Sequence, residues 1–229
     1  MRLSPLKHFL LAALLWLPLA FFLWFSFAAV LSWPVIALAR LVLLDAWPSL
    51  FTAIVQGGDV IDAGGQIIAH ASYLMQITSG VLVNAAAPGA PAKFGFIEPV
   101  VNPMVYGYSL PLFAGLVLAS PLTWPRALRQ LAIGIPVIWC TQAFGVVAEA
   151  LKSVCLDAGS AGVEAAGRAG LSLEFVALCY QFGYLILPAL VPAVLWIVLN
   201  RSFIETLTRA AGTEPAAAAE VETPHSGVH

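Results

Sequence analysis

The residues that could form a catalytic site in this sequence are few and far apart. His70 could act as the base that generates a thiolate at Cys155, as in a thiol transpeptidase. Arg40 or Arg168 could then hold the oxyanion. However, His70 lies in a strand-like run and Cys155 follows the end of an apolar helix, where both residue types are ordinary structural residues. We therefore expect no catalytic residue and no enzyme activity, and a membrane thiol transpeptidase is the weakest alternative.

Metal ligands and cofactor motifs are equally sparse. Cys140, Cys155 and Cys179 form no CxxC pair and lack the spacing of a zinc site or a disulfide scaffold. Asp59 and Asp62 could hold a cation, but two carboxylates around a turn are more simply solvated. We expect no metal site and no cofactor.

The composition places the chain in a membrane. Hydrophobic residues make up 61% of the 229 residues and charged residues 10%, with a mean hydropathy of +0.92. Soluble domains carry about 25% charged residues, so this chain cannot cover its surface with polar groups and must be solvated largely by lipid. The net charge of −2 offers no basic surface to nucleic acid, which is not an expected partner.

Four apolar segments are long enough to cross a bilayer as helices, which takes about 20 residues. Pro103 and Pro111 interrupt the second segment, and Pro188 and Pro192 should bend the fourth. The four predicted spans are Phe9–Leu31, Val101–Leu118, Leu128–Ala150 and Phe175–Leu199.

The segment between the first two spans has a different character. The pair Trp33-Pro34 should end the first helix, and Val35–Leu44 is apolar but too short to span, which suits an interfacial helix. Short β-branched or aromatic pieces follow over residues 52–78. The pairs Gly57-Gly58 and Gly64-Gly65 predict turns between them, so we expect a small antiparallel sheet.

The predicted fold class is mainly α. It is a polytopic membrane protein with about four transmembrane helices and a small outer α+β element between helices 1 and 2. Residues 1–31 should form the N-terminal tail and first helix, and residues 32–100 the outer interfacial helix and β-rich segment. Residues 101–201 should form helices 2–4, and residues 202–229 a disordered tail. Within the outer segment, residues 85–92 should form a loop leading back to the bilayer.

The distribution of lysine and arginine predicts the orientation in the membrane. One side should hold six of the ten basic residues: Arg2, Lys7, Arg126, Arg129, Arg201 and Arg209. The other side should hold Arg40, Lys93, Lys152 and Arg168, spread over two longer segments. We therefore expect both termini to be cytoplasmic, and segments 32–100 and 151–174 to face outward.

Few polar side chains lie within the spans. Glu149 stands near the outer end of the third span with Lys152 three residues on, so we expect an interfacial ion pair. Gln142 and Gln181 should hydrogen-bond between helices. The near absence of buried charge argues against a proton-coupled transporter, but a small transporter or channel subunit remains the main alternative function.

The most distinctive stretch crowds two tyrosines, an asparagine and two prolines at the start of the second span. Asn102, Pro103, Tyr106 and Tyr108 suit an interfacial anchor, where phenol groups meet water, or a docking surface for a membrane partner. We take these four residues as candidate partner-binding residues.

Three features together carry a family resemblance. They are Leu14-Leu15-Trp16-Leu17-Pro18 with Phe22-Leu23-Trp24, the β-rich outer segment, and the pattern Asn-Pro-x-x-Tyr-Gly-Tyr-x-Leu-Pro from Asn102. With these features the chain, up to about Leu199, resembles the exosortase H-associated membrane proteins, small bacterial inner-membrane proteins encoded beside a sorting transpeptidase. The resemblance implies a non-catalytic accessory subunit of an exosortase-type envelope protein sorting or export system. It also implies an exosortase-type transpeptidase as a partner, besides membrane lipid.

The resemblance assigns no catalytic residue to this chain. The family has none to carry over. The exosortases themselves use a cysteine, an arginine and a histidine, and this sequence has no convincing set, which fits an accessory protein and not the enzyme.

Overall fold

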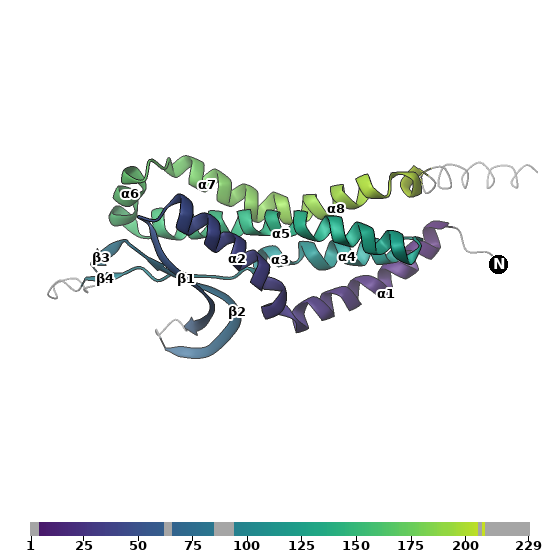
Figure 1. Cartoon of the computed structure of the whole chain (residues 1–229), viewed down its shortest axis with the longest axis horizontal. Helices are drawn as coiled ribbons and strands as arrows, with labels where there is room; N and C mark the ends of the chain where they lie inside the picture. Colours follow the sequence, from purple (N-terminus) through teal and green to yellow (C-terminus); the bar gives the residue numbers. More distant parts are fainter. Residues whose placement is uncertain (1–4, 62–65, 85–93, 206–207, 209–229) are drawn as a thin grey trace, which may run out of the picture.

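A computed structural model of the chain describes residues 5–61, 66–84, 94–205 and 208. Within these ranges the protein is mostly helical, with a small β element after the first two helices (Figure 1). The predicted loop at residues 85–92, the pair Gly64-Gly65 and nearly all of the predicted C-terminal tail lie outside the described residues.

The first two helices follow one another along the molecule. Helix α1 covers Pro5–Ser26 and α2 covers Ala28–Ala46, with a break at Phe27. They do not fold back as a hairpin, because α1 packs on α4 and α2 packs on α5 and the strands (Figure 1). The prediction that Trp33-Pro34 ends the first helix is wrong, since Pro34 lies inside α2. The predicted short interfacial helix is therefore the second half of a 19-residue helix.

The outer sheet is antiparallel, as predicted, with the strand order β1-β2-β5. Its strands are β1 (Phe51–Ile61), β2 (Ile67–Ser79) and β5 (Val100–Val101). The predicted turn at Gly57-Gly58 is wrong. Gly57 has φ +97° and shares the partner Met75 with Gln56, which makes this point a bulge within one long strand. A separate pair joins β3 (Leu82–Asn84) to β4 (Phe94–Phe96).

The remaining helices form three columns of the bundle, each made of one helix or of helices that follow one another end to end. The short α3 (Met104–Gly107) leads into α4 (Ser109–Ala119), and α5 (Trp124–Cys155) runs beside both. After α6 (Gly159–Arg168), a third column is built from α7 (Leu173–Gln181), the π-helix η1 (Phe182–Ile186) and α8 (Leu187–Leu199). The π-helix ends two residues before Pro188, whose missing N–H interrupts the regular helical hydrogen bonding.

Within the described residues, four helical segments are long and apolar enough to cross a membrane: Leu6–Ser26, Ala28–Ala46, Trp124–Cys155 and Leu173–Leu199. The number matches the prediction, but the second predicted span does not qualify, because Met104–Ala119 is shorter. Helix α2 completes the count of four, but it continues in the direction of α1, and it is α4 that carries the chain back toward the start of α5 (Figure 1). Helix α5 has 32 residues and is about 48 Å long, so it exceeds a hydrocarbon core of about 30 Å.

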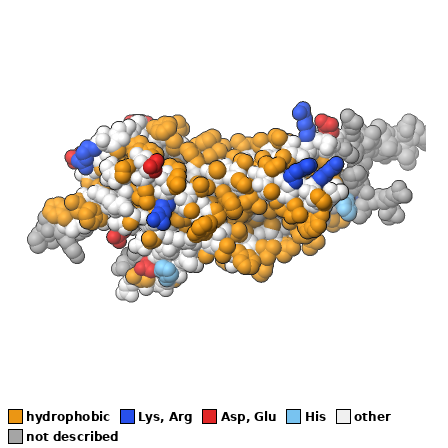
Figure 2. All heavy atoms as spheres, viewed as in Figure 1, with side chains coloured by type: hydrophobic (Ala, Val, Ile, Leu, Met, Phe, Trp, Pro, Cys, Tyr) orange, Lys and Arg blue, Asp and Glu red, His pale blue; other side chains and the backbone are white. Residues whose placement is uncertain are grey.

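The surface of the bundle is that of a membrane protein. Apolar side chains cover the middle of the molecule, and charged side chains gather toward its two ends (Figure 2). On α1, large residues such as Leu14 and Phe25 are each 72% exposed. A soluble monomer rarely exposes so large an apolar area, so lipid must cover this surface. The protein is a multi-pass membrane protein.

The start of α1 and the end of α8 lie at the same end of the bundle. The ring of Phe9 stacks on that of Trp196 with 5.5 Å between centroids. The start of α5 joins them, since the Gln130 side chain exchanges hydrogen bonds of 3.0 Å with Asn200. We call this the basic end, because its elements carry Lys7, Arg126, Arg129 and Arg201.

Candidate functional site

A group of aromatic and charged side chains meets between α3, α5, α7 and η1. We call Tyr106, Glu149, Lys152, Tyr180 and Tyr184 the Tyr106 cluster. The Tyr106 ring is completely buried and lies edge-on to Tyr184, with 6.2 Å between centroids. Tyr184 stacks on Tyr180 at 5.6 Å, and the Lys152 Nζ atom lies 5.4 Å from the centre of the Tyr180 ring. The cluster therefore links three columns of the bundle.

Two glycines make room for this cluster. A Cβ atom at Gly145 in α5 would overlap the ring of Tyr106. A Cβ atom at Gly183 in η1 would lie only 3.0 Å from the Cα atom of Gly145. The close approach of α5 and η1 and the seating of Tyr106 both require these small residues.

The centre of the cluster contains two unpaired oxygens. The Tyr106 hydroxyl and Glu149 Oε2 are both buried, and neither has a hydrogen-bond partner among the residues that the structure describes. They lie close enough to interact electrostatically, but no hydrogen bond of good geometry joins them. Buried polar atoms nearly always form hydrogen bonds, so these two oxygens are exceptions. Each could still form a hydrogen bond within the cluster.

The predicted ion pair between Glu149 and Lys152 does not form. Lys152 instead pairs with Asp157, with 2.7 Å between Nζ and Oδ2. The reason is local: α5 ends at Cys155, and the chain turns so that Asp157 meets the lysine that precedes it. Glu149 is left facing Tyr106 and has no cation within ion-pair distance among the described residues.

The candidate docking residues occupy different environments. The Asn102 side chain accepts a hydrogen bond of 3.0 Å from the Met104 N–H and so supports the start of α3. Pro103 and Tyr106 are buried, and Tyr108 is half-buried. Burial removes Tyr106 from direct contact with a partner, so Tyr108 and Asn102 are the two that retain accessible surface.

The residues considered for thiol chemistry are not brought together. Cys155 is completely buried in the main hydrophobic core, where burial shields the thiol from any large substrate. His70 lies on β2, mostly exposed, with its Nδ1 atom 3.0 Å from Asp59 Oδ1. Arg168 pairs with Glu164 on α6. No group of three or more metal-ligating side chains occurs in the part of the chain that the structure describes.

Polar side chains do join the helices within the apolar region. The Gln142 amide donates to Ser109 Oγ at 2.9 Å, which confirms the expectation of an interhelical bond there. Gln181 is exposed instead. The sequence reasoning missed the reciprocal bonds of Gln130 and Asn200. The signal was present, since each is a carboxamide at the end of a long apolar run.

A comparison with known protein families settles the relationship of the chain. Residues 3–203 match the exosortase H-associated membrane proteins. The chain belongs to this family. The match spans all four membrane-crossing candidates, the outer sheet and the Tyr106 cluster. No curated protein sequence and no solved structure matches the chain.

Proposed function

We propose that this member of the exosortase H-associated family is a non-catalytic accessory subunit of an exosortase-type sorting or export system in the bacterial inner membrane. Family membership over residues 3–203 is the observation that carries the proposal. The partner would be an exosortase-type transpeptidase in the same membrane.

The surroundings of Cys155 and His70 support a non-catalytic role. A thiol nucleophile needs its base within hydrogen-bond reach and a path for the substrate. Cys155 is buried, whereas His70 is engaged by Asp59 on an exposed sheet edge. Replacing Cys155 by alanine should therefore leave sorting intact. If Cys155→Ala abolished sorting without lowering the protein level, a transpeptidase function would replace our proposal.

The orientation proposed for this role puts the basic end in the cytoplasm. Four of the seven described lysine and arginine residues on the two ends belong to the basic end, and lysine and arginine favour the cytoplasmic side. The β element and α6 would then face outward, where a transpeptidase meets its exported substrates.

The outer strands offer a surface for that partner. The strands lie outside the apolar middle of the helix bundle, but several of their large apolar side chains are exposed. Phe94 is 70% exposed, Phe96 57%, and Ile67 and Ile68 64% each. Exposed apolar groups on a small sheet mark a contact with another protein or with the membrane surface. Tyr108 and Asn102, near the start of the helical part that follows β5, are further candidates for contact with the partner.

Co-purification from mild detergent tests the proposal. The wild-type protein should retain the exosortase encoded beside it, if the two are expressed together. The double variant Phe94→Ser/Phe96→Ser should retain much less of it. Val163→Ser on α6 is the matched control, because Val163 is also exposed, at 46%, but belongs to a helix and not to the strands. Failure of the wild-type pair to associate, with good expression of both proteins, would refute the accessory role.

A further inference from the structure

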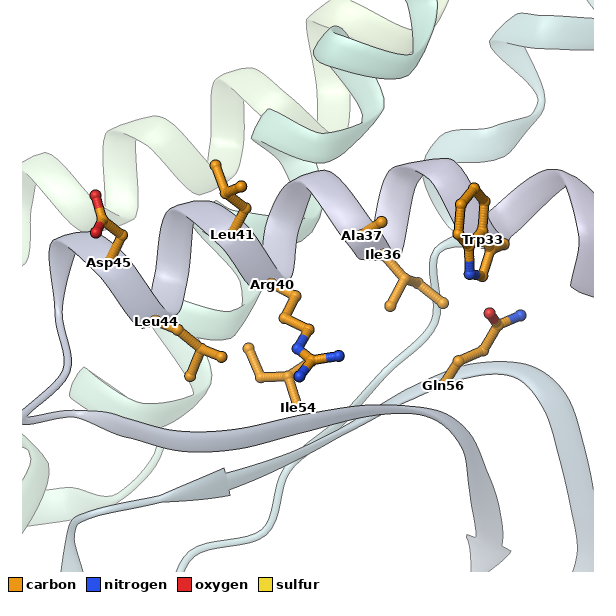
Figure 3. Close-up of a pocket in the computed structure, with 9 residues that line it drawn as sticks. All are labelled: Trp33, Ile36, Ala37, Arg40, Leu41, Leu44, Asp45, Ile54 and Gln56. Atoms are coloured by element: carbon orange, nitrogen blue, oxygen red, sulfur yellow. The ribbon is translucent and has the colours of Figure 1, made fainter.

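A groove of about 530 Å³ runs between α2 and β1 (Figure 3). Arg40 extends from α2 toward β1, and Trp33 lines the same groove, whereas Asp45 points away from it. Gln56 extends from β1 toward α2, where its Nε2 atom donates a hydrogen bond of 2.7 Å to the Ala29 carbonyl. Apolar residues, among them Ile36 and Ile54, line the rest. The groove therefore combines one cation with an apolar lining.

Arg40 has no ion-pair or hydrogen-bond partner among the described residues. Arginine is suited to binding phosphate, because its planar fork of N–H groups can donate two parallel hydrogen bonds. An unpaired arginine in a groove thus favours an anionic group as the occupant.

Two further hollows share lining residues in sequence with this groove and lie toward the apolar region of the bundle. Trp33 and Gln56 also line a smaller hollow of about 340 Å³, together with Val30. Val30 in turn lines a crevice of about 360 Å³ between α1 and α4, whose other walls include Leu23, Leu110 and Leu118. The walls of that crevice are entirely apolar. From Val30 to Arg40 the path follows ten residues of α2, about 15 Å.

We propose that this groove and the two hollows that share its lining residues bind one glycerophospholipid. Its phosphate lies on Arg40, and one acyl chain follows α2 past Trp33 into the crevice between α1 and α4. The arrangement matches the lipid in order: a cation for the headgroup, an indole at the level where polar and apolar parts meet, and a purely apolar channel for the chain. The site is independent of the docking proposed for the outer strands.

The probe for this site is phosphatidylglycerol added to the full-length protein in mild detergent, with bound lipid measured by native mass spectrometry. The wild-type protein should bind one lipid per chain, and Arg40→Gln should weaken binding roughly tenfold or more, because the charged hydrogen bonds to phosphate are lost. Arg168→Gln is the matched control: Arg168 is exposed, but its partner is Glu164 and it lies outside the groove. Equal lipid binding by the two variants would overturn the proposal.

A second variant tests the path of the acyl chain. Val30→Trp should weaken binding of the long-chain lipid while Arg40 remains in place, and Val30 is 69% exposed, so the larger side chain should not prevent folding. The water-soluble headgroup glycerophosphoglycerol should not displace the lipid at equal concentration. Displacement by the headgroup alone would mean a simple phosphate site. If Arg40→Gln kept lipid binding but lost the transpeptidase, the groove would be a protein contact. Either result rejects the lipid site.

Discussion

The ring of Tyr106 in α3 lies directly against the backbone of Gly145 in α5, in space that any side chain at position 145 would fill. We expect Gly145→Ala to lower the free energy of unfolding by about 1–3 kcal/mol, since overpacking forces the ring or the helix to move. Thermal unfolding in detergent measures the effect.

Gly167 in α6 provides the control for this substitution. A Cβ atom there would meet nothing within 4 Å. Gly167→Ala should leave the melting temperature unchanged or raise it slightly, because alanine favours a helix over glycine by about 1 kcal/mol at most. If the two variants melted together, Tyr106 would not be held by Gly145 as described.

The Tyr106 hydroxyl gives a second prediction. This hydroxyl is buried without a hydrogen-bond partner, so Tyr106→Phe removes a group that costs free energy to bury. The variant should be as stable as the wild type or more stable. Tyr106→Ala, in contrast, removes a completely buried ring and should cost about 3–5 kcal/mol. A marked loss of stability in Tyr106→Phe would show that the hydroxyl makes a bond in the folded protein.

The sequence predicted the membrane class, the number of spanning segments and the antiparallel outer sheet, because these follow from hydropathy and from local residue preferences. It placed the end of the first helix wrongly at Trp33-Pro34. Proline ends a helix only where its missing N–H and its ring cannot be accommodated. Here α2 continues past Pro34, and the helix as a whole packs along α5. Such tertiary support is not visible in local sequence.

The Tyr106 cluster was harder to predict for a related reason. Spacing on α5 paired Glu149 with Lys152, but the turn after Cys155 brings Asp157 to the lysine. Tyr106 was expected at a surface because tyrosines are common there. Its burial depends on Gly145 and Gly183, which lie far from it in the chain. Only the packing of three columns reveals that these residues meet.

The proposed orientation predicts the labelling of introduced cysteines by a membrane-impermeant maleimide. Ser160 in α6 and Thr123 before α5 are both exposed, at opposite ends of the bundle. In a background with Cys140, Cys155 and Cys179 replaced by alanine, Ser160→Cys should react in intact spheroplasts. Thr123→Cys should react only after the membrane is permeabilised. The reverse pattern would place the basic end outside the cytoplasm.

Glu149 provides the last prediction, because its carboxylate has a buried oxygen and no cation in ion-pair contact. Lys152, the nearest candidate, is bound to Asp157. A buried carboxylate without an ion-pair partner is unfavourable, so Glu149→Gln, which keeps the shape and cannot ionise, should melt at the same temperature as the wild type or higher. Its co-purification with the exosortase should be unchanged. Glu164→Gln is the control: Glu164 forms an exposed pair with Arg168, and its replacement should change stability by no more than about 0.5 kcal/mol.

If Glu149→Gln folded normally but failed to retain the exosortase or to support sorting, the carboxylate would have a specific role. Glu149 and Tyr106 would then form a functional pair and not merely a packing contact.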